Sequence, residues 1–359
     1  MPAVFAAAGH PLLTNTLGAQ MPESVMDLIV ADLKSSGPSY YPQRGELRNV
    51  RVVGHTPKSD HYIYDIVIDF ADSCERVAAK VYRPGKTGME TARKQARTEA
   101  GNLRQIHEVF QKKHLTGVPR PIGDFTESGA VVSEKLSGLP LQSIIMKAAL
   151  LPGYADRGIL TEGARQAGLW LRSFHKATAD LPEPLDGNAL QKELEKLCDS
   201  CRGEGLDDAA VRTILAGARS ILAKSKSKLP SSAVLCDFNP LNVIIMENGI
   251  GFCDFAKMKM RGNSYHDVAT FLACVEALEK YPFCNRAITQ EVQEEFLNAY
   301  GATAQEQQIL RVLKMKALLG MFAQGRGVKE SAVRKKVMWA TVMKRFIQQA
   351  AQRSLAPAA

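Results

Sequence analysis

Apolar residues at the start of the chain recur with the spacing of a helix. From Met26 to Leu33 they fall at i, i+3, i+4 and i+7, which predicts an amphipathic helix over 22–36. The stretch 35–38 (SSGP) contains residues that commonly end helices, so we expect the helix to stop there.

The next part of the chain is typical of β-strands. Three segments are rich in strand-forming residues, at 47–53, 62–70 and 76–82, and the second of them alternates apolar and polar positions. Turn-forming residues fill 56–61, between the first two segments. This order predicts an antiparallel meander.

A helix and a further strand complete the first part. The segment 90–114 has helical spacing, and Glu99 shares its apolar face, so this inward carboxylate requires a partner. An apolar strand is expected at 130–136, and the Ser-Gly-Leu-Pro break after it predicts a boundary between one lobe at 1–136 and another at 137–359.

Helical spacing dominates the second part, with short strands between the helices. Helices are expected at 160–180, 188–200, 207–225, 266–280, 290–300 and 305–350, and strands near 233–236, 242–246 and 250–253. The fold class is therefore α+β, with a strand-rich first lobe.

Composition and charge narrow the classes of protein. With 45% hydrophobic and 23% charged residues, the 359-residue chain is globular rather than disordered. Much of the net charge of +9 comes from eight basic residues near the end, which leaves little reason to expect a nucleic-acid partner. These residues are Arg326, Lys329, Arg334, Lys335, Lys336, Lys344, Arg345 and Arg353.

Cysteine usage and the hydropathy of the ends bear on the compartment. Seven scattered cysteines do not form a disulfide framework, which favours a reducing compartment such as the cytoplasm. The first residues have no basic segment typical of a signal peptide, and no apolar run approaches about 18 residues. Neither secretion nor a membrane span is expected.

The most informative stretch is VLCDFNPLNVIIMENGIGFCDF, at 234–255. It places Asp237 and Asn242 on one loop, and Asp254 at the end of the next hairpin. Such a trio suits phosphoryl transfer, because one carboxylate can orient a hydroxyl while an amide oxygen and another carboxylate bind Mg²⁺.

The spacing D-x-x-x-x-N, followed by an aspartate on a hairpin, resembles the protein-kinase-like fold, especially its aminoglycoside phosphotransferase and choline kinase branch. The resemblance covers roughly 45–275. That branch usually has H-G-D-x-x-P-x-N. Asp237, Pro240 and Asn242 match this motif, whereas Leu235 and Cys236 replace the His and Gly.

This resemblance implies a two-lobe fold with a small antiparallel-sheet N-lobe and a larger, mostly helical C-lobe. It also implies that Asp237 orients the substrate hydroxyl, and that Asn242 and Asp254 bind Mg²⁺ that bridges the phosphates of ATP, with GTP as the alternative nucleotide. Ala256 stands where protein kinases have the glycine of D-F-G.

The first lobe contains the expected partners for the nucleotide phosphates. Lys80 in VAAKVY resembles the kinase lysine that contacts the α- and β-phosphates, and Glu99 in RTEAGNL would hold its ammonium. The phosphate-covering loop at 54–61 has a single glycine, so backbone N–H groups near Lys58 and Ser59 either cradle phosphate or belong to a solvated turn. By position, Glu134 to Leu136 would be the hinge that binds adenine.

Two spacings favour a small-molecule acceptor over a protein. About 60 residues separate His175 from Asp237, an insert from which small-molecule kinases of this fold commonly build their acceptor site. Only 13 positions separate Asp254 from Asp267, too few for an activation segment, and A-P-E is absent there. Asp267 itself either supports the catalytic loop or caps the next helix.

Acidic residues of the insert leave the acceptor open. They either attract a cation such as an aminoglycoside or choline, or form a solvated helix face with interleaved basic residues. These acids are Glu193, Glu195, Asp199, Glu204, Asp207 and Asp208. The basic, amphipathic C-terminal helix either packs on the C-lobe or makes peripheral contact with an anionic membrane.

The interpretation that unites these features is an ATP-dependent phosphotransferase acting on a hydroxyl of a small molecule, such as an aminoglycoside, choline or a sugar. A kinase for a lipid-linked sugar at the membrane surface is an alternative. The weak phosphate loop and the replacements at Leu235 and Cys236 suggest another, a catalytically silent nucleotide-binding regulator.

Overall fold

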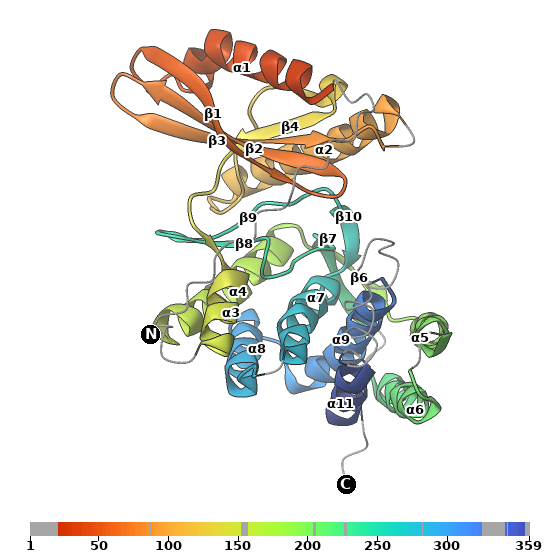
Figure 1. The fold of residues 1–359 in the computed structure, drawn as a ribbon. Coiled ribbons are helices and arrows are strands. Elements are labelled where there is room, and N and C mark those ends of the chain that lie inside the picture. The colour runs from red at the N-terminus through yellow and green to blue at the C-terminus, as the bar shows by residue number, and fades with distance from the viewer. Residues whose placement is uncertain are drawn as a thin grey trace, which may run out of the picture.

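The computed structural model describes residues 21–85, 88–151, 157–203, 206–225, 228–281, 283–324, 342 and 344–355. Its first part contains a four-stranded sheet in the order β1-β2-β3-β4, with every neighbouring pair antiparallel (Figure 1). The strands are β1 (Leu47–Pro57), β2 (His61–Phe70), β3 (Cys74–Tyr82) and β4 (Ala130–Glu134). The predicted meander is confirmed, although β1 continues four residues further than expected.

Two helices cover opposite faces of this sheet. Helix α1 (Met21–Tyr40) buries Ile29 and Leu33 against Ile66 and Ile68 of β2. Helix α2 (Met89–Lys112) lies on the other face, and its apolar side also joins the core of the second part. The two parts are therefore packed together through α2.

Helix α1 ends later than the sequence suggests. It includes Pro38 in its last turn, where a missing N–H removes only one backbone bond. The side chain of Asp32 accepts hydrogen bonds from Ser36 Oγ at 3.2 Å and from the Tyr40 hydroxyl at 2.8 Å. These bonds hold the last turn together beyond the expected stop at 35–38.

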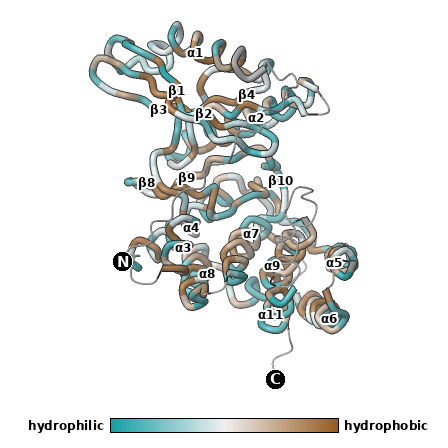
Figure 2. Tube along the Cα trace, viewed as in Figure 1, coloured by the Kyte–Doolittle hydropathy of each residue, from teal (hydrophilic) through white to brown (hydrophobic). Residues whose placement is uncertain are grey.

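The second part is mainly helical, and hydrophobic stretches of its helices face one another in Figure 2. Its helices are α3 (Leu141–Leu150), α4 (Arg157–Ala177), α5 (Gly187–Gly203), α6 (Asp208–Lys224), α7 (Tyr265–Glu276), α8 (Arg286–Tyr300), α9 (Ala304–Gln324) and α11 (Lys344–Leu355). Among the described residues, none of the helices is long and apolar enough to span a bilayer.

Two small sheets lie where the two parts meet. One has the order β10-β7-β6, and the other β5-β8-β9. Their strands are β5 (Leu139–Pro140), β6 (Asp180–Pro184), β7 (Lys228–Val234), β8 (Val243–Met246), β9 (Gly249–Phe252) and β10 (Lys259–Asn263). Strands β5, β6 and β10 were not predicted from the sequence, because they are short and two of them contain proline. Helix α3 was not predicted either.

The segment that leads into β5 requires a glycine. Strand β5 follows Gly138 and pairs with β8, and a Cβ on Gly138 would lie 2.0 Å from the carbonyl oxygen of Ile245. A larger residue would push β5 away from β8, the strand that begins directly after Asn242.

The C-terminal helix packs on the second part through its apolar side. Phe346, Ile347 and Leu355 of α11 are buried, and the helix contacts α6 and α9. Of the helix expected over 305–350, the structure describes α9 at one end and α11 at the other, while 325–341 and 343 lie outside the described residues. The basic residues between 326 and 336 lie outside the described residues.

Two buried carboxylates anchor α11. Arg353 donates to Glu279 at 2.8 Å and to Glu276 at 3.1 Å, and both acids are less than a tenth exposed. The acids come from the end of α7 and from the 3₁₀ helix η3 (Ala277–Lys280) that follows it. Arg353 is thus a structural contact and not simply part of a solvated basic face.

We predict that Arg353→Met lowers the free energy of unfolding by about 2 kcal/mol, because two buried carboxylates lose a charged donor. Chemical denaturation measures the change. Arg345→Met is the matched control, since Arg345 is exposed on the same helix. Equal stabilities of the two variants would show that the Arg353 ion pairs do not anchor α11.

Candidate active site

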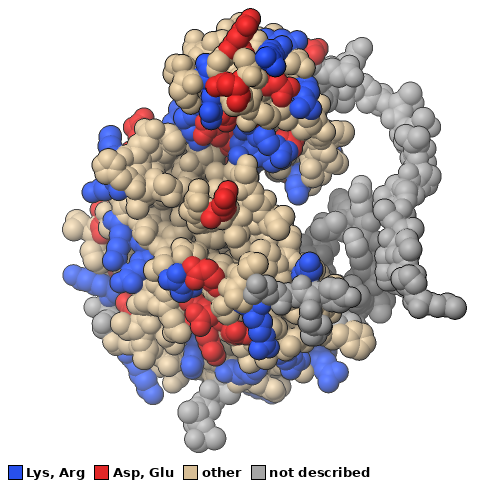
Figure 3. All heavy atoms as spheres, turned by 90° about the vertical axis from the view of Figure 1, so that its left-hand side faces the viewer, with Lys and Arg blue, Asp and Glu red and all other residues tan. Residues whose placement is uncertain are grey.

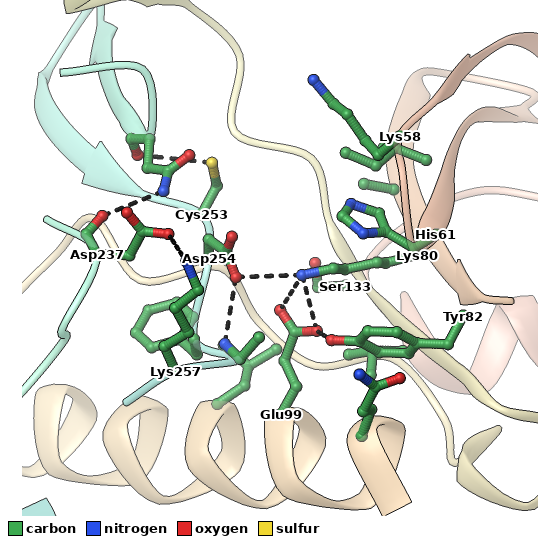
Figure 4. A pocket seen from close by; sticks show the side chains of 18 of the residues that line it. Lys58, His61, Lys80, Tyr82, Glu99, Ser133, Asp237, Cys253, Asp254 and Lys257 are labelled. Carbon is green, nitrogen blue, oxygen red and sulfur yellow. Dashed lines mark hydrogen bonds and ion pairs between the residues drawn. The ribbon is translucent and has the colours of Figure 1, made fainter. Parts of the chain in front are cut away.

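Lys80 and Glu99 form an ion pair in the cleft between the two parts. Lys80 is on β3, and its Nζ is 3.1 Å from both carboxylate oxygens of Glu99 on α2. The hydroxyl of Tyr82, two residues along β3, also donates to Glu99. The inward carboxylate noted in the sequence therefore has two partners (Figure 4).

The same ammonium reaches across to the second part. Lys80 Nζ lies 3.1 Å from Asp254 Oδ1, although the two residues are 174 positions apart in the chain. Asp254 follows β9, and the backbone N–H of Ala256 donates to the same oxygen at 3.2 Å. Lys80 is thus shared by one carboxylate from each part.

Burial and neighbouring charges have opposite effects on the pKa values of Lys80, Asp254 and Glu99. Burial alone would lower the pKa of Lys80, but Glu99 and Asp254 outweigh it, so the pKa is raised and the ammonium stays charged. Burial would raise the pKa of Asp254, yet the charge of Lys80 and the Ala256 N–H hold it below its usual value. For Glu99, burial dominates and raises the pKa.

The loop between β7 and β8 presents Asp237 and Asn242. Asn239 organises this loop, since its side-chain oxygen accepts from the N–H groups of Leu241 and Asn242, and its Nδ2 donates to Asp237 Oδ1 at 2.7 Å. The side-chain nitrogen of Asn242 donates to the carbonyl oxygen of Asp237 at 3.2 Å. The two predicted residues therefore share a single hydrogen-bonded turn.

A fully buried carboxylate supports the start of this loop. Asp267 on α7 accepts the N–H groups of Leu235 and Cys236, each at 2.8 Å, and lies 3.2 Å from His175. Burial alone would raise its pKa, but hydrogen bonds from histidine and backbone donors outweigh this and lower it. The prediction that Asp267 supports the loop is confirmed, and His175 is the buried, hydrogen-bonded partner.

Cys236 has an unusual backbone conformation. Its φ is 60°, in the left-handed region that costs a residue with a Cβ about 1–2 kcal/mol. Cys236 occupies the position next to Asp237 where the related motif has glycine. The backbone thus keeps a conformation suited to glycine, and its N–H bond to Asp267 helps to hold it there.

The predicted site residues come together in one cleft of about 800 Å³. Its lining includes Ser59, Lys80, Glu99, Glu134, Leu136, Asp237, Asn242 and Asp254. Segments more than 170 residues apart in the sequence thus meet around the Lys80 ammonium.

The two backbone sites proposed for a nucleotide are only partly available. The Lys58 N–H closes the β1–β2 hairpin by donating to His61 O at 2.8 Å, so it cannot also cradle phosphate. At the hinge, the N–H groups of Glu134 and Lys135 donate to carbonyl oxygens of Arg120 and Arg76. Neither of these two hinge N–H groups is therefore available to donate to adenine.

Lys257 and Asn239 are cleft residues that the sequence analysis missed. The ammonium of Lys257 lies 2.7 Å from Asp237 Oδ2 (Figure 4), whereas Asn239 donates to the other carboxylate oxygen, Oδ1. For Asn239, its position two residues after Asp237 was an available signal. For Lys257, 20 residues away, the sequence contains no spacing rule that predicts the contact.

The acids of the insert are engaged by neighbouring residues. Glu193 pairs with Lys316, Glu195 with Arg219, and Asp199 and Asp208 with Arg202, while Asp207 caps α6. Glu204 lies outside the described residues. Figure 3 shows a different side of the molecule, the left-hand side of Figure 1, and acidic and basic side chains are interspersed there too. These pairs favour the solvated-face interpretation over a site for a cation.

We predict that Cys236→Gly raises the free energy of unfolding by about 1 kcal/mol, because glycine adopts a positive φ without the Cβ clash. Cys236→Ala keeps the Cβ and is the matched control, for which no gain is expected. Thermal or urea unfolding compares the two. A glycine variant no more stable than the alanine variant would show that the backbone is not strained here.

Comparison with solved structures supports the kinase-like fold. An aminoglycoside phosphotransferase from Alicyclobacillus acidocaldarius is 14% identical, with a TM-score of 0.53, over 96% of this chain and 98% of that one. The ADP-bound aminoglycoside phosphotransferase APH(2'')-Ib is 11% identical, with a TM-score of 0.52, over 92% and 99%. Amicoumacin kinase hAmiN, in complex with AMP-PNP, Ca²⁺ and Ami, is 12% identical, with a TM-score of 0.52, over 93% and 98%.

Sequence comparison places the chain in a family. No curated protein matches it significantly. A family model described as the phosphotransferase enzyme family matches residues 66–314, which include β3, α2 and both loops of the cleft. The chain therefore belongs to the phosphotransferase enzyme family.

Proposed function

We propose that this enzyme transfers the γ-phosphoryl group of ATP to a hydroxyl of a small molecule. The observation that carries the proposal is the ammonium of Lys80, held between Glu99 and Asp254 in the cleft that also contains Asp237. Lys80 provides a cation for phosphates, Asp254 a carboxylate for a metal, and Asp237 a carboxylate for a hydroxyl. These are the groups that phosphoryl transfer needs.

The residues divide the work by position. Lys80, braced by Glu99, binds the α- and β-phosphates and fixes the nucleotide. Asp237, oriented by Asn239, accepts a hydrogen bond from the acceptor hydroxyl and aims its oxygen at the γ-phosphorus. Most of the rate enhancement then comes from positioning and charge neutralisation, with little covalent chemistry by the protein.

The donor atoms of the site fit Mg²⁺. Asp254 Oδ1 is taken by Lys80 and Ala256, which leaves Oδ2, and the Asn242 amide nitrogen is bound to Asp237 O, which leaves its side-chain oxygen. One carboxylate and one amide oxygen suit a cation that takes its remaining ligands from phosphate and water. When bound there, Mg²⁺ would neutralise charge that develops on the phosphates.

Support for ATP comes from the cleft and from the similar structures. Two of those structures contain ADP or AMP-PNP. In this chain, the Glu134 carbonyl and the Leu136 N–H are the hinge groups that we propose for adenine. GTP is the alternative nucleotide, and it would require a different donor and acceptor pattern at this hinge.

The acceptor is a small molecule with a free hydroxyl, such as an aminoglycoside, choline or a sugar. Two of the similar proteins are named aminoglycoside phosphotransferases. The paired acids of the insert provide little unbalanced negative charge, an arrangement that favours a sugar-like acceptor over a polycation. Seven free cysteines fit a reducing compartment, and we propose the cytoplasm.

Two alternatives lead to different products. A lipid-linked sugar as acceptor would suit a basic C-terminal segment, although the apolar side of α11 is buried against α6 and α9. A silent nucleotide-binding regulator would explain the replacements at Leu235 and Cys236. The hydrogen bonds that this backbone donates to Asp267, however, maintain the loop despite the replacements.

We predict that Asp237→Asn lowers the transfer rate by at least about a thousandfold while Mg-ATP still binds, because only the acceptor side of the cleft loses its carboxylate. The assay follows label from γ-labelled ATP and Mg²⁺ into a bacterial extract, with nucleotide affinity measured by calorimetry. Asp180→Asn, an exposed aspartate paired with Arg261, is the control.

Whether the label is found in the aqueous or the organic phase of the extract distinguishes the alternatives. Asp237-dependent label in the aqueous phase supports a small-molecule acceptor, whereas label in the organic phase supports the lipid-linked sugar. Mg-ATP binding without any transfer would favour the silent regulator. Undiminished transfer by Asp237→Asn would contradict the role given to this residue.

A further inference from the structure

Lys257 reaches Asp237 from the other loop of the cleft. It is the third residue after Asp254, in the segment between β9 and β10, and its Nζ lies 2.7 Å from Asp237 Oδ2. Asn239 donates to the other oxygen at the same distance. Each oxygen of the Asp237 carboxylate therefore has one donor, and the two donors fix its plane.

This ion pair contributes little to folding. The Lys257 side chain is 67% exposed and that of Asp237 is 25% exposed, and pairs with an exposed partner are typically worth about 1 kcal/mol or less. A lysine held at ion-pair distance from Asp237 without stabilising the fold points to a role in the cleft. Its exposed stem also leaves the ammonium free to change partner.

The charges around Lys257 indicate what that partner is. Asp237 on one side and Asp254 on the other would both repel a phosphoryl group that passes between them. Lys80 already serves Asp254 and Glu99. Lys257 lines the same cleft and places an ammonium directly beside Asp237.

We propose that Lys257 is a positioning residue for phosphoryl transfer, which holds Asp237 in place before transfer and directs its charge to the transferred phosphoryl group during transfer. This inference rests on the function proposed above. It adds a residue whose ion pair with Asp237 crosses from one loop of the site to the other.

The acceptor oxygen forms a bond to the γ-phosphorus while the bond from that phosphorus to the β–γ bridging oxygen breaks, and its electron pair leaves with ADP. The hydroxyl proton passes to Asp237 and then to water. Lys257 exchanges no proton in this step and contributes only its charge and its donors.

The experiment compares Lys257→Gln, Lys257→Arg and Lys259→Gln in the label-transfer assay, with ATP varied at a fixed amount of bacterial extract. Lys259 is exposed on β10, two residues along the chain, and is the matched control. For Lys257→Gln we expect the maximal rate to fall about 100- to 1000-fold, the loss typical of one donor to a transition state, with KM for ATP within about threefold. Lys257→Arg should stay within about tenfold of the wild type, because it keeps the charge.

Several outcomes would overturn the inference. One is a maximal rate of Lys257→Gln equal to that of Lys259→Gln, and another is a loss confined to KM for ATP. A rate of Lys257→Arg as low as that of Lys257→Gln would also exclude a role for the charge. Melting temperatures check folding, and a variant that melts with the wild type but transfers slowly excludes a structural explanation.

Failure of the inference is distinguishable from failure of the proposed function. If the wild-type enzyme transfers label and Asp237→Asn does not, the function stands and the lysine variants decide the role of Lys257. If the wild-type enzyme transfers no label from ATP to any fraction, the proposed function fails, and the inference about Lys257 fails with it.

Discussion

The ammonium of Lys80 is the contact on which the rest of the cleft depends. It joins Glu99 of the first part to Asp254 of the second, and so sets the distance between the two walls of the cleft. All three groups are largely buried, so a partner left alone would pay a desolvation cost of several kcal/mol. Lys80, Glu99 and Asp254 are therefore stable in this arrangement only when all three are present. The relative position of the two parts is thus coupled to the charge of one lysine.

The buried carboxylate of Asp267 supports the loop that carries Asp237 on the other side of the cleft. This carboxylate binds the N–H groups of Leu235 and Cys236, so it acts on the backbone and not on the side chains that differ from the related motif. Replacement of the motif's His and Gly can leave the loop in place for that reason. The cost is a left-handed cysteine next to Asp237, which the buried hydrogen bonds offset.

Sequence patterns predicted the parts of the site that depend on short spacings. Lys80, Glu99, Asp237, Asn242 and Asp254 each lie in a local motif, and the structure places all five in one cleft. The engaged N–H groups of the hairpin and the hinge could not be predicted, because they depend on strand pairing. The same holds for Lys257, whose contact with Asp237 is set by the path of the chain between β9 and β10, and for the short strands β6 and β10.

The balance of fixed charge in the cleft has a consequence for the nucleotide. The lining of the cleft is close to balanced, with five carboxylates, Asp60, Glu99, Glu134, Asp237 and Asp254, and five ammonium groups, Lys58, Lys80, Lys94, Lys135 and Lys257. A triphosphate would add further negative charge to a partly desolvated space, where unlike charges must be close to balance. These side chains therefore favour a nucleotide that enters together with its divalent cation, and they leave Asp254 Oδ2 and the Asn242 oxygen as the atoms to receive it.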